Sequence, residues 1–383
     1  MLKRIAVSGL MVAALWAAIG YAQSTTPPAA TAPAAAPTTG LKDAFAGKFL
    51  IGTAADPGNY TDAELANIKA NYNIMTPENC MKPQPIHPTE DTYDWAQADT
   101  LVKWCTDNNI KVWGHNLCWH SQTANWFFTD AKDPTKWASR DTIVKRFQDH
   151  IKTVVGRYKG KTYGWDVVNE AINDNGQGTE ANPENLRNDN WYQGVGKDYL
   201  TIAFKTAHEA DPDAKLYYND YNIEQGAVKG TGKHQWSMIL LKRLIAEGAP
   251  ITGVGIQGHW HLDTNLADVE KAIDDYASLG LKVGISELDV TATGTNSGAL
   301  GGGGRGGPVT DEDFKKQAVM YAKLFDIFNR HAKDMERVTL WGTNDRRSWR
   351  SGQYPLVYDA QLNPKPAYKA IMDVAEGKGL PQE

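Results

Sequence analysis

Short apolar runs alternate with longer segments of helical periodicity along most of the chain. The short runs are rich in β-branched and aromatic residues and predict strands at 49–54, 74–79, 110–119, 164–171, 214–221, 253–260, 281–290 and 337–345. The longer segments carry apolar residues at i, i+3 and i+4 and predict helices, for example at 61–71, 141–157, 198–211, 232–247, 265–279 and 311–333. Thr61 is a candidate helix cap, and a last helix is expected near Pro366.

This alternation predicts an α/β fold, a (β/α)8 TIM barrel that fills residues 41–378 as one domain. The competing α/β architecture, a Rossmann fold, would need a GxGxxG turn after the first strand. The sequence at that place is GTAADPG, which lacks the pattern. We therefore expect the barrel.

The predicted strands change from apolar to polar residues where they end. The endings are Glu78 and Asn79, His115 and Trp119, Asn169 and Glu170, Asn219 and Asp220, Gln257 and His259, Glu287 and Asp289, and Trp341 and Asp345. The C-terminal ends of the strands surround the pocket in which such barrels carry out chemistry. One polar ending could be a cap or a core hydrogen-bonding group, but so many at one end of a barrel predict an active site.

Two carboxylates, Glu170 and Glu287, close the fourth and seventh predicted strands. These strands lie on different sides of an eight-stranded barrel, so their carboxylates can face one another across its mouth. Cleavage of a glycosidic bond needs such a pair, one acid to protonate the leaving oxygen and one to attack carbon or activate water. The alternative is a pair of salt-bridged glutamates, but neither has Lys or Arg beside it in the sequence.

The aromatic content of the chain is compatible with binding of flat apolar ligands such as sugar rings. The chain has 13 Trp and 16 Tyr, which either fill the core or stack on sugar rings, and a net charge of −5, which gives no footprint for nucleic acid. The three cysteines, Cys80, Cys105 and Cys118, allow at most one disulfide. Buried free thiols are expected, with a Cys80–Cys118 bridge as the alternative, and the absence of a CxxC pair argues against structural zinc.

The first 40 residues are expected to lie outside the barrel. Residues 1–22 have a basic start, an apolar run and small residues before Ala22, which is typical of a cleaved signal peptide. Residues 23–40 are rich in Pro, Ala and Thr and are typical of a linker. The mature protein is therefore expected to be secreted, to the periplasm or the medium, without a membrane anchor.

Seven sequence blocks together resemble one enzyme family. They are ENCMK (78–82), GHNLCWHSQTANW (114–126), WDVVNEAI (165–172), YNDYN (218–222), GVGIQGHW (253–260), ISELDV (285–290) and WGTNDRRSW (341–349). In order and spacing they are similar to those of family 10 glycoside hydrolases, which are endo-β-1,4-xylanases. The resemblance extends from FLIGTAAD at 49–56 to NPKPAY at 363–368.

The resemblance implies a retaining hydrolysis of internal xylosidic bonds in xylan and xylo-oligosaccharides, by a monomer without a cofactor or metal. Glu170 is then the general acid/base, and Glu287 is the nucleophile that forms a glycosyl-enzyme intermediate. Glu170 should be protonated at rest, so its pKa is expected to lie above that of Glu287.

The same resemblance implies roles for the neighbouring residues. Asn169 would bind the sugar 2-hydroxyl, Gln257 would orient the ring or Glu170, and His259 would bond Glu287 with Asp289 behind its imidazole. Trp341 and Trp349 would crowd the space beyond C5 and favour xylose over glucose. The other expected substrate-binding residues are Glu78, Asn79, Lys82, His115, Trp119 and Tyr221.

Rival functions are a metal-dependent barrel hydrolase, a sugar-binding protein on an inactive barrel, and a β-1,4-glucanase. The first would use the HxH of His259 and His261 together with Asp345, although such enzymes usually carry HxH on the first strand. The second conflicts with the presence of both glutamates and their supporting side chains. The third shares the two carboxylates, but the blocks ENCMK and GHNLCWHSQ favour xylanase.

Some features depart from the family pattern or have no assigned role. Asn116, Ala124 and Asn344 stand where the family often has Thr, Pro and Thr. The glycine-rich stretch 291–310 is either a rim element beside Glu287 or an unselected insertion. Three arginines after the last strand are either solvated charges or contacts for acidic side groups of decorated xylan, and they are Arg346, Arg347 and Arg350.

Overall fold

Eight parallel strands close into a barrel, as the sequence predicts. The computed structural model describes residues 39–56, 58, 60–293 and 309–381. The eight barrel strands are β1 (Leu50–Ala54), β2 (Ile74–Thr76), β3 (Lys111–His115), β4 (Thr162–Asn169), β5 (Lys215–Asp220), β6 (Gly253–Ile256), β8 (Lys282–Val290) and β9 (Met335–Leu340), and the two-residue β7 (His259–Trp260) pairs with β8 alone. Around the barrel they follow in chain order, and β9 pairs with β1 to close it.

The prediction of one continuous sixth strand at 253–260 is wrong. The strand is interrupted after Ile256, and only the two-residue β7 resumes pairing, alongside β8, so that β6 and β8 are direct neighbours in the barrel. Gly258 turns the backbone with a φ of +81°, a region that strands do not use. Predicted strands two, three and eight also extend too far, because β2 ends at Thr76, β3 at His115 and β9 at Leu340. Apart from His115, which is the last residue of β3, the predicted endings of these strands lie in the loops that follow.

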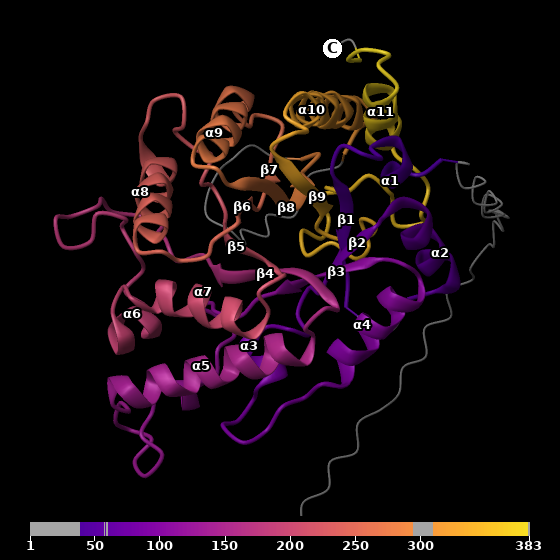
Figure 1. Cartoon of the computed structure of the whole chain (residues 1–383). Coiled ribbons are helices and arrows are strands. Elements are labelled where there is room, and N and C mark those ends of the chain that lie inside the picture. Colours follow the sequence, from indigo (N-terminus) through magenta and orange to yellow (C-terminus); the bar gives the residue numbers. More distant parts are fainter. Residues whose placement is uncertain (1–38, 57, 59, 294–308, 382–383) are drawn as a thin grey trace, which may run out of the picture. The chain divides into compact units, whose positions relative to one another are not determined.

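Helices surround the strands (Figure 1). They are α1 (Leu41–Ala44), α2 (Asp62–Asn71), α3 (Pro83–Ile86), α4 (Ala96–Asp107), α5 (Arg140–Arg157), α6 (Asn190–Val195), α7 (Tyr199–Ala210), α8 (Gly232–Ala246), α9 (Leu266–Ser278), α10 (Asp311–Arg330) and α11 (Pro366–Ala375), with a 3-10 turn η1 (Asn125–Phe127). Thr61 caps α2 as predicted, in a reciprocal box with Glu64. Of the longer helices, α4 has no range among the examples given above, but it lies where a helix is expected between the second and third predicted strands.

Two apolar clusters stabilise the barrel. The large one fills the space between the strands and the helices, where Trp165, Leu216 and Val254 are fully buried. A small one, built from Ile74, Trp113 and Tyr217, forms separately from it. Glycines make room for its aromatic rings, since a Cβ at Gly253 would lie 2.1 Å from the Tyr217 ring. Dense packing of this kind gives the polar groups at the mouth of the barrel a fixed support.

A buried ion pair crosses the barrel between β4 and β9. Arg337 donates to Asp166 over 3.3 Å, and both side chains are almost completely shielded from solvent. Asp166 also accepts from the Trp113 indole at 2.8 Å and contacts Nδ1 of His115 at 2.9 Å. The Arg337 guanidinium lies 4.0 Å from the Trp113 ring centroid. Donors from β3 and β9 therefore satisfy one carboxylate on β4.

Within the described residues, the three cysteines are buried free thiols, so the structure has the first of the two predicted arrangements. No helix in this part of the chain is both long enough and apolar enough to cross a membrane. The predicted signal peptide and most of the linker lie outside the described residues, as does most of the glycine-rich stretch 291–310.

We predict that Arg337→Met lowers the free energy of unfolding by about 3–5 kcal/mol, because it leaves the Asp166 charge buried without its partner. Urea unfolding followed by circular dichroism measures the loss. The matched control is the double variant Asp166→Asn with Arg337→Met, which removes the charge as well and should recover much of the loss. A loss below about 1 kcal/mol in the single variant would contradict the prediction.

Candidate active site

The polar endings of the strands meet in one pocket of about 920 Å³ at the mouth of the barrel. All of the predicted site residues except Asp289 line it. They are Glu78, Asn79, Lys82, His115, Trp119, Asn169, Glu170, Tyr221, Gln257, His259, Glu287, Trp341 and Trp349. Asp289 lies behind the pocket wall, in contact with His259. The prediction that these strand ends converge is therefore confirmed.

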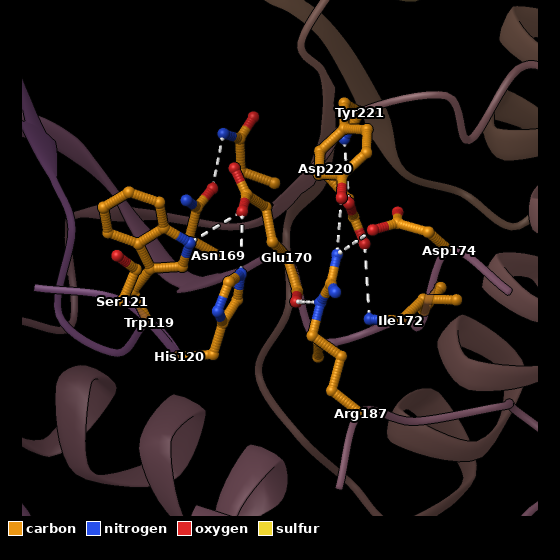
Figure 2. A network of polar contacts seen from close by, with 12 residues as sticks. Trp119, His120, Ser121, Asn169, Glu170, Ile172, Asp174, Arg187, Asp220 and Tyr221 are labelled. Carbon is orange, nitrogen blue, oxygen red and sulfur yellow. Dashed lines mark hydrogen bonds and ion pairs between the residues drawn. The ribbon is translucent and has the colours of Figure 1, made fainter. Parts of the chain in front are cut away.

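Three donors surround the Glu170 carboxylate, and Figure 2 shows two of them, Trp119 and His120. Trp119 Nε1 and His120 Nε2 contact Oε2 at 2.7 and 3.1 Å, and Gln257 Nε2 donates to Oε1 at 2.8 Å. Burial raises the pKa of Glu170, but the hydrogen bonds from His120, Gln257 and Trp119 outweigh burial and lower the pKa to about 2. The expectation that Glu170 is protonated at rest is therefore wrong for this arrangement of donors.

The backbone of Glu170 is also held on both sides. Its φ is +57°, in the left-handed region that a residue with a side chain rarely adopts. Its N–H donates to the carbonyl of Asn219 at 2.8 Å, and its carbonyl accepts from Nε of Arg187 at 2.8 Å. Arg187 in turn binds Asp174 at 3.1 Å, as Figure 2 shows. This bracing turns the residue after β4 towards the pocket.

Glu287, on β8, accepts from two side chains. Asn219 Nδ2 donates to Oε1 at 2.9 Å, and Nε2 of His259 contacts Oε2 at 3.2 Å. The amide of Asn219 fits because residue 255 on the neighbouring strand is glycine. A Cβ at Gly255 would lie 2.2 Å from the Asn219 amide oxygen. The small residue on β6 thus permits the hydrogen bond to Glu287.

His259 connects Glu287 to Asp289. Its Nδ1 contacts Asp289 Oδ2 at 2.9 Å. Burial lowers the pKa of His259, but the carboxylates of Asp289 and Glu287 outweigh burial and raise the pKa to about 9. The imidazole is therefore protonated at neutral pH and donates from both nitrogens. Trp349 and Arg350 complete the shell of Asp289, at 2.9 and 3.1 Å.

Amide side chains connect the two carboxylates. Asn219, which binds Glu287, also donates to Oδ1 of Asn169 at 2.9 Å. Nε2 of Gln257, which binds Glu170, lies 3.5 Å from the same Asn169 oxygen. Glu170 and Glu287 therefore belong to one buried network of amides and histidines, and within the described residues neither forms the salt bridge with Lys or Arg that was the alternative interpretation.

One wall of the pocket follows β2. Asn79 donates to Asp56 at 3.0 Å and accepts from Lys82 at 3.1 Å. The Lys82 ammonium lies 4.9 Å from the Trp119 ring centroid. Burial lowers the pKa of Lys82 and raises the pKa of Glu78. These polar groups, with their hydrogen-bonding capacity only partly used, suit hydroxyl ligands.

The wall that follows β5 is built around Tyr221. Arg187 donates to its hydroxyl at 2.6 Å, and the Lys233 ammonium lies 3.5 Å from its ring centroid. Lys233 also binds Asp220 at 2.9 Å and Asp174 at 3.2 Å. Tyr221 thus lines the pocket, as predicted, but its hydroxyl and one face of its ring are already occupied.

The residues of the metal hypothesis do not come together. His259 binds the two carboxylates described above, whereas Nδ1 of His261 contacts Thr291 at 3.0 Å and Asp345 pairs with Lys365 at 3.0 Å. In the part of the chain that the structure describes, no group of three or more His, Cys, Asp or Glu side chains could hold a metal ion.

The three arginines after β9 bind residues of the protein itself. Arg346 and Arg347 each lie 2.9 Å from the fully shielded carboxylate of Glu64, near the start of α2. Arg350 binds Asp289 and the carbonyl oxygens of Trp260 and His259. The interpretation as solvated charges holds for Arg346, whose side chain is 56% exposed, but not for Arg350, which is 9% exposed. Contact with acidic side groups of xylan stays a prediction.

Three residues that contact Glu170 or Glu287 are not among the predicted site residues. His120 and Arg187 contact Glu170, and Asn219 contacts Glu287, yet none of the three was assigned a role. His120 and Asn219 lie inside the quoted blocks, so the motifs carried a signal for them. Further residues that line the pocket have no signal in any block, and they are Asp174, Asn175, Gln225, Lys233 and Trp236.

A closed parallel barrel with two linked carboxylates among polar and aromatic side chains defines a barrel glycoside hydrolase. The model of glycosyl hydrolase family 10 matches residues 40–374, and the chain belongs to this family. The chain is 38% identical over 341 residues to a β-1,4-xylanase of Dictyoglomus thermophilum, with 87% of this chain and 90% of that protein covered. It is 39% identical over 356 residues to exoglucanase XynX of Acetivibrio thermocellus, with 89% of this chain covered.

Among solved structures, the chain is similar to TsXylA, an intracellular xylanase of Thermoanaerobacterium saccharolyticum, whose mutant was solved with xylotriose. The TM-score is 0.78 at 38% identity, and the match covers 87% of this chain and 98% of that one. The first curated relatives are much longer proteins. The chain spans 30% of exoglucanase XynX and 27% of an endo-1,4-β-xylanase A of Thermoanaerobacterium saccharolyticum.

We predict that His120→Ala raises the pKa of Glu170. The side chain removed is one that lowers this pKa, and burial, which raises it, remains. A carbon-13 NMR titration of the labelled Glu170 carboxyl measures the change. His208→Ala, at an exposed position on α7, is the control and should leave the titration unchanged. A pKa that stays the same or falls in His120→Ala would contradict the prediction.

Proposed function

We propose that the protein is an endo-β-1,4-xylanase that hydrolyses internal bonds of xylan with retention of configuration. The observation that carries the proposal is the pair Glu170 and Glu287, joined through amides in one pocket of about 920 Å³. The xylanases among its relatives, and the xylotriose bound by the TsXylA mutant, support the choice of sugar.

In the proposed reaction, Glu287 attacks the anomeric carbon while Glu170 protonates the departing oxygen. The products of this step are a glycosyl ester on Glu287 and the free aglycone. Glu170 then takes a proton from water, which attacks the ester and releases the sugar and the Glu287 carboxylate. The protonated His259 donates to Glu287, and Asn169 is placed beside both carboxylates to bind the sugar 2-hydroxyl.

The proposal requires that Glu170 gain a proton before the first step. The hydrogen-bond donors around Glu170 favour its ionised form, whereas burial favours its protonated form. We infer that sugar binding raises the pKa of Glu170, because it excludes further water and competes for the donors Trp119 and His120. The glycosidic oxygen would then receive the proton in a water-poor site.

A β-1,4-glucanase is the second candidate, since one relative is named an exoglucanase. The proposed selection against glucose rests on Trp341 and Trp349. Trp341 is almost fully buried and packs edge-on against His115, with ring centroids 5.5 Å apart. Trp349 is 40% exposed, and its indole is fixed by Asp289 at 2.9 Å. A fixed indole leaves little room for a hydroxymethyl group.

We predict that the protein releases reducing sugar from soluble xylan and far less from carboxymethylcellulose. Glu287→Ala should lose at least about 1,000-fold in kcat on xylan, because no nucleophile remains. The matched control is Glu209→Ala, an exposed glutamate of α7, which should retain the wild-type rate. Preference for the cellulose derivative would support the glucanase instead, and activity that survives in Glu287→Ala would contradict the proposed nucleophile.

Azide separates the two carboxylate roles. With an aryl xylobioside that has a good leaving group, azide should rescue Glu287→Ala as the α-xylobiosyl azide. The same anion should rescue Glu170→Ala as the β-azide, because there it attacks the covalent intermediate. The opposite assignment of the two products would exchange the roles of Glu170 and Glu287.

We also propose that the protein is exported, with cleavage after Ala22 and with residues 23–40 as a linker to the catalytic domain at 41–378. The support is the sequence pattern of residues 1–22, namely a basic start, an apolar run and small residues before the cleavage point. We predict that intact-mass analysis of the protein from the medium or periplasm finds Gln23 as the first residue. Accumulation in the cytoplasm with residues 1–22 retained would contradict export.

A further inference from the structure

The two sides of the pocket come from opposite sides of the barrel. The closed order is β1, β2, β3, β4, β5, β6, β8 and β9, so β5 stands across from β1, which β2 and β9 flank. Lys82 and Asn79 follow β2, and Trp341 follows β9, whereas Tyr221 follows β5. A chain held by the first group and cut at Glu170 and Glu287 therefore continues over the loops after β5.

Tyr221 offers little surface to that continuing chain. It is 5% exposed, its hydroxyl is bound by Arg187, and the Lys233 ammonium covers its ring. Sugar recognition on this side needs another apolar face, because xylose rings present C–H surfaces that pack on flat aromatic groups.

Trp236 supplies such a face. It lies in the first turns of α8, three residues after Lys233 and thus on the same side of the helix. It lines the pocket and is partly exposed, with the rest of the indole packed on the core. The other pocket tryptophans have partners, since Trp119 and Trp349 donate hydrogen bonds and Trp341 packs on two histidines.

Within the described residues, Trp236 makes no ring contact and its indole N–H donates no hydrogen bond, in contrast to the other indoles of the pocket. Two exposed amide side chains, Asn175 and Gln225, line the same side of the pocket. An open indole face beside free amides is the combination that sugar sites use, with the ring for C–H surfaces and the amides for hydroxyls.

We propose that Trp236 forms a further aglycone subsite, where its indole stacks on a xylosyl ring beyond the ring released first at the cleaved bond. The inference rests on the proposed xylanase function and specifies which substrates that function prefers. Longer xylo-oligosaccharides gain the stacking contact, whereas an aryl xylobioside, with one aryl group in place of the released ring, ends before it reaches Trp236.

The test compares kcat/KM for 4-nitrophenyl xylobioside, xylotetraose and xylohexaose. Trp236→Ala should lose roughly tenfold on xylohexaose, about the loss of one aromatic stacking contact, and much less on the aryl xylobioside. It should also shift the products of xylotetraose from xylobiose towards xylose plus xylotriose, because fewer units are then held on the aglycone side. Trp236→Phe, which retains a ring, should recover much of both effects.

Trp137→Ala is the matched control, because Trp137 is 48% exposed and does not line the pocket. It should behave as wild type on all three substrates. An equal loss on short and long substrates in Trp236→Ala, or no loss on any, would overturn the subsite. A wild-type protein that cleaves none of the xylosides but cleaves cello-oligosaccharides would instead overturn the proposed function itself.

Discussion

The charge of Asp166 is the constraint on which the upper half of the barrel depends. A carboxylate in a barrel interior is costly unless donors surround it, and here the donors come from Trp113, His115 and Arg337. Satisfying Asp166 fixes strands β3, β4 and β9 relative to one another and holds the His115 ring at the floor of the pocket. The next residues upward on β4 end in Asn169 and Glu170, so the position of the active-site pair is set from below.

The buried polar groups above Asp166 also need hydrogen-bond partners, and the bonds that they form link Glu170 to Glu287. Asn219 can reach both Glu287 and Asn169 only because Gly255 on the next strand leaves space for its amide. Asp289 behind His259, together with Glu287, raises the pKa of His259 and keeps its imidazole protonated. A network this closely satisfied has few alternative arrangements, which is what a preorganised site requires.

The barrel and the convergence of its strand ends could be predicted, because both depend on local patterns. Apolar runs such as the one before Asn169 mark strands, and parallel strands deliver their polar ends to one face. The break at Gly258 could not be read in this way, since a run of apolar and small residues does not reveal a positive φ. The pKa of Glu170 could not be predicted from the sequence either. It depends on the balance between burial, which raises it, and hydrogen-bond donors from two separate loops, at 119–120 and 257, which lower it. In the sequence, Trp236 has the spacing of a residue on the apolar face of a helix. Only the structure shows that it lines the pocket.

The wall of the pocket after β5 and the backbone of Glu170 are mechanically coupled. The left-handed conformation of Glu170 is costly for a residue with a Cβ and persists only where neighbours impose it. Arg187 supplies one of those contacts and is itself held by Asp174 and the Tyr221 hydroxyl. Tyr221 therefore helps, through Arg187, to position Glu170 and has little free surface for a ligand. Because Tyr221 is occupied in this way, an apolar face for sugar on this wall has to come from a second aromatic residue. Trp236 is placed to provide it, since within the described residues no other ring of the pocket contacts it.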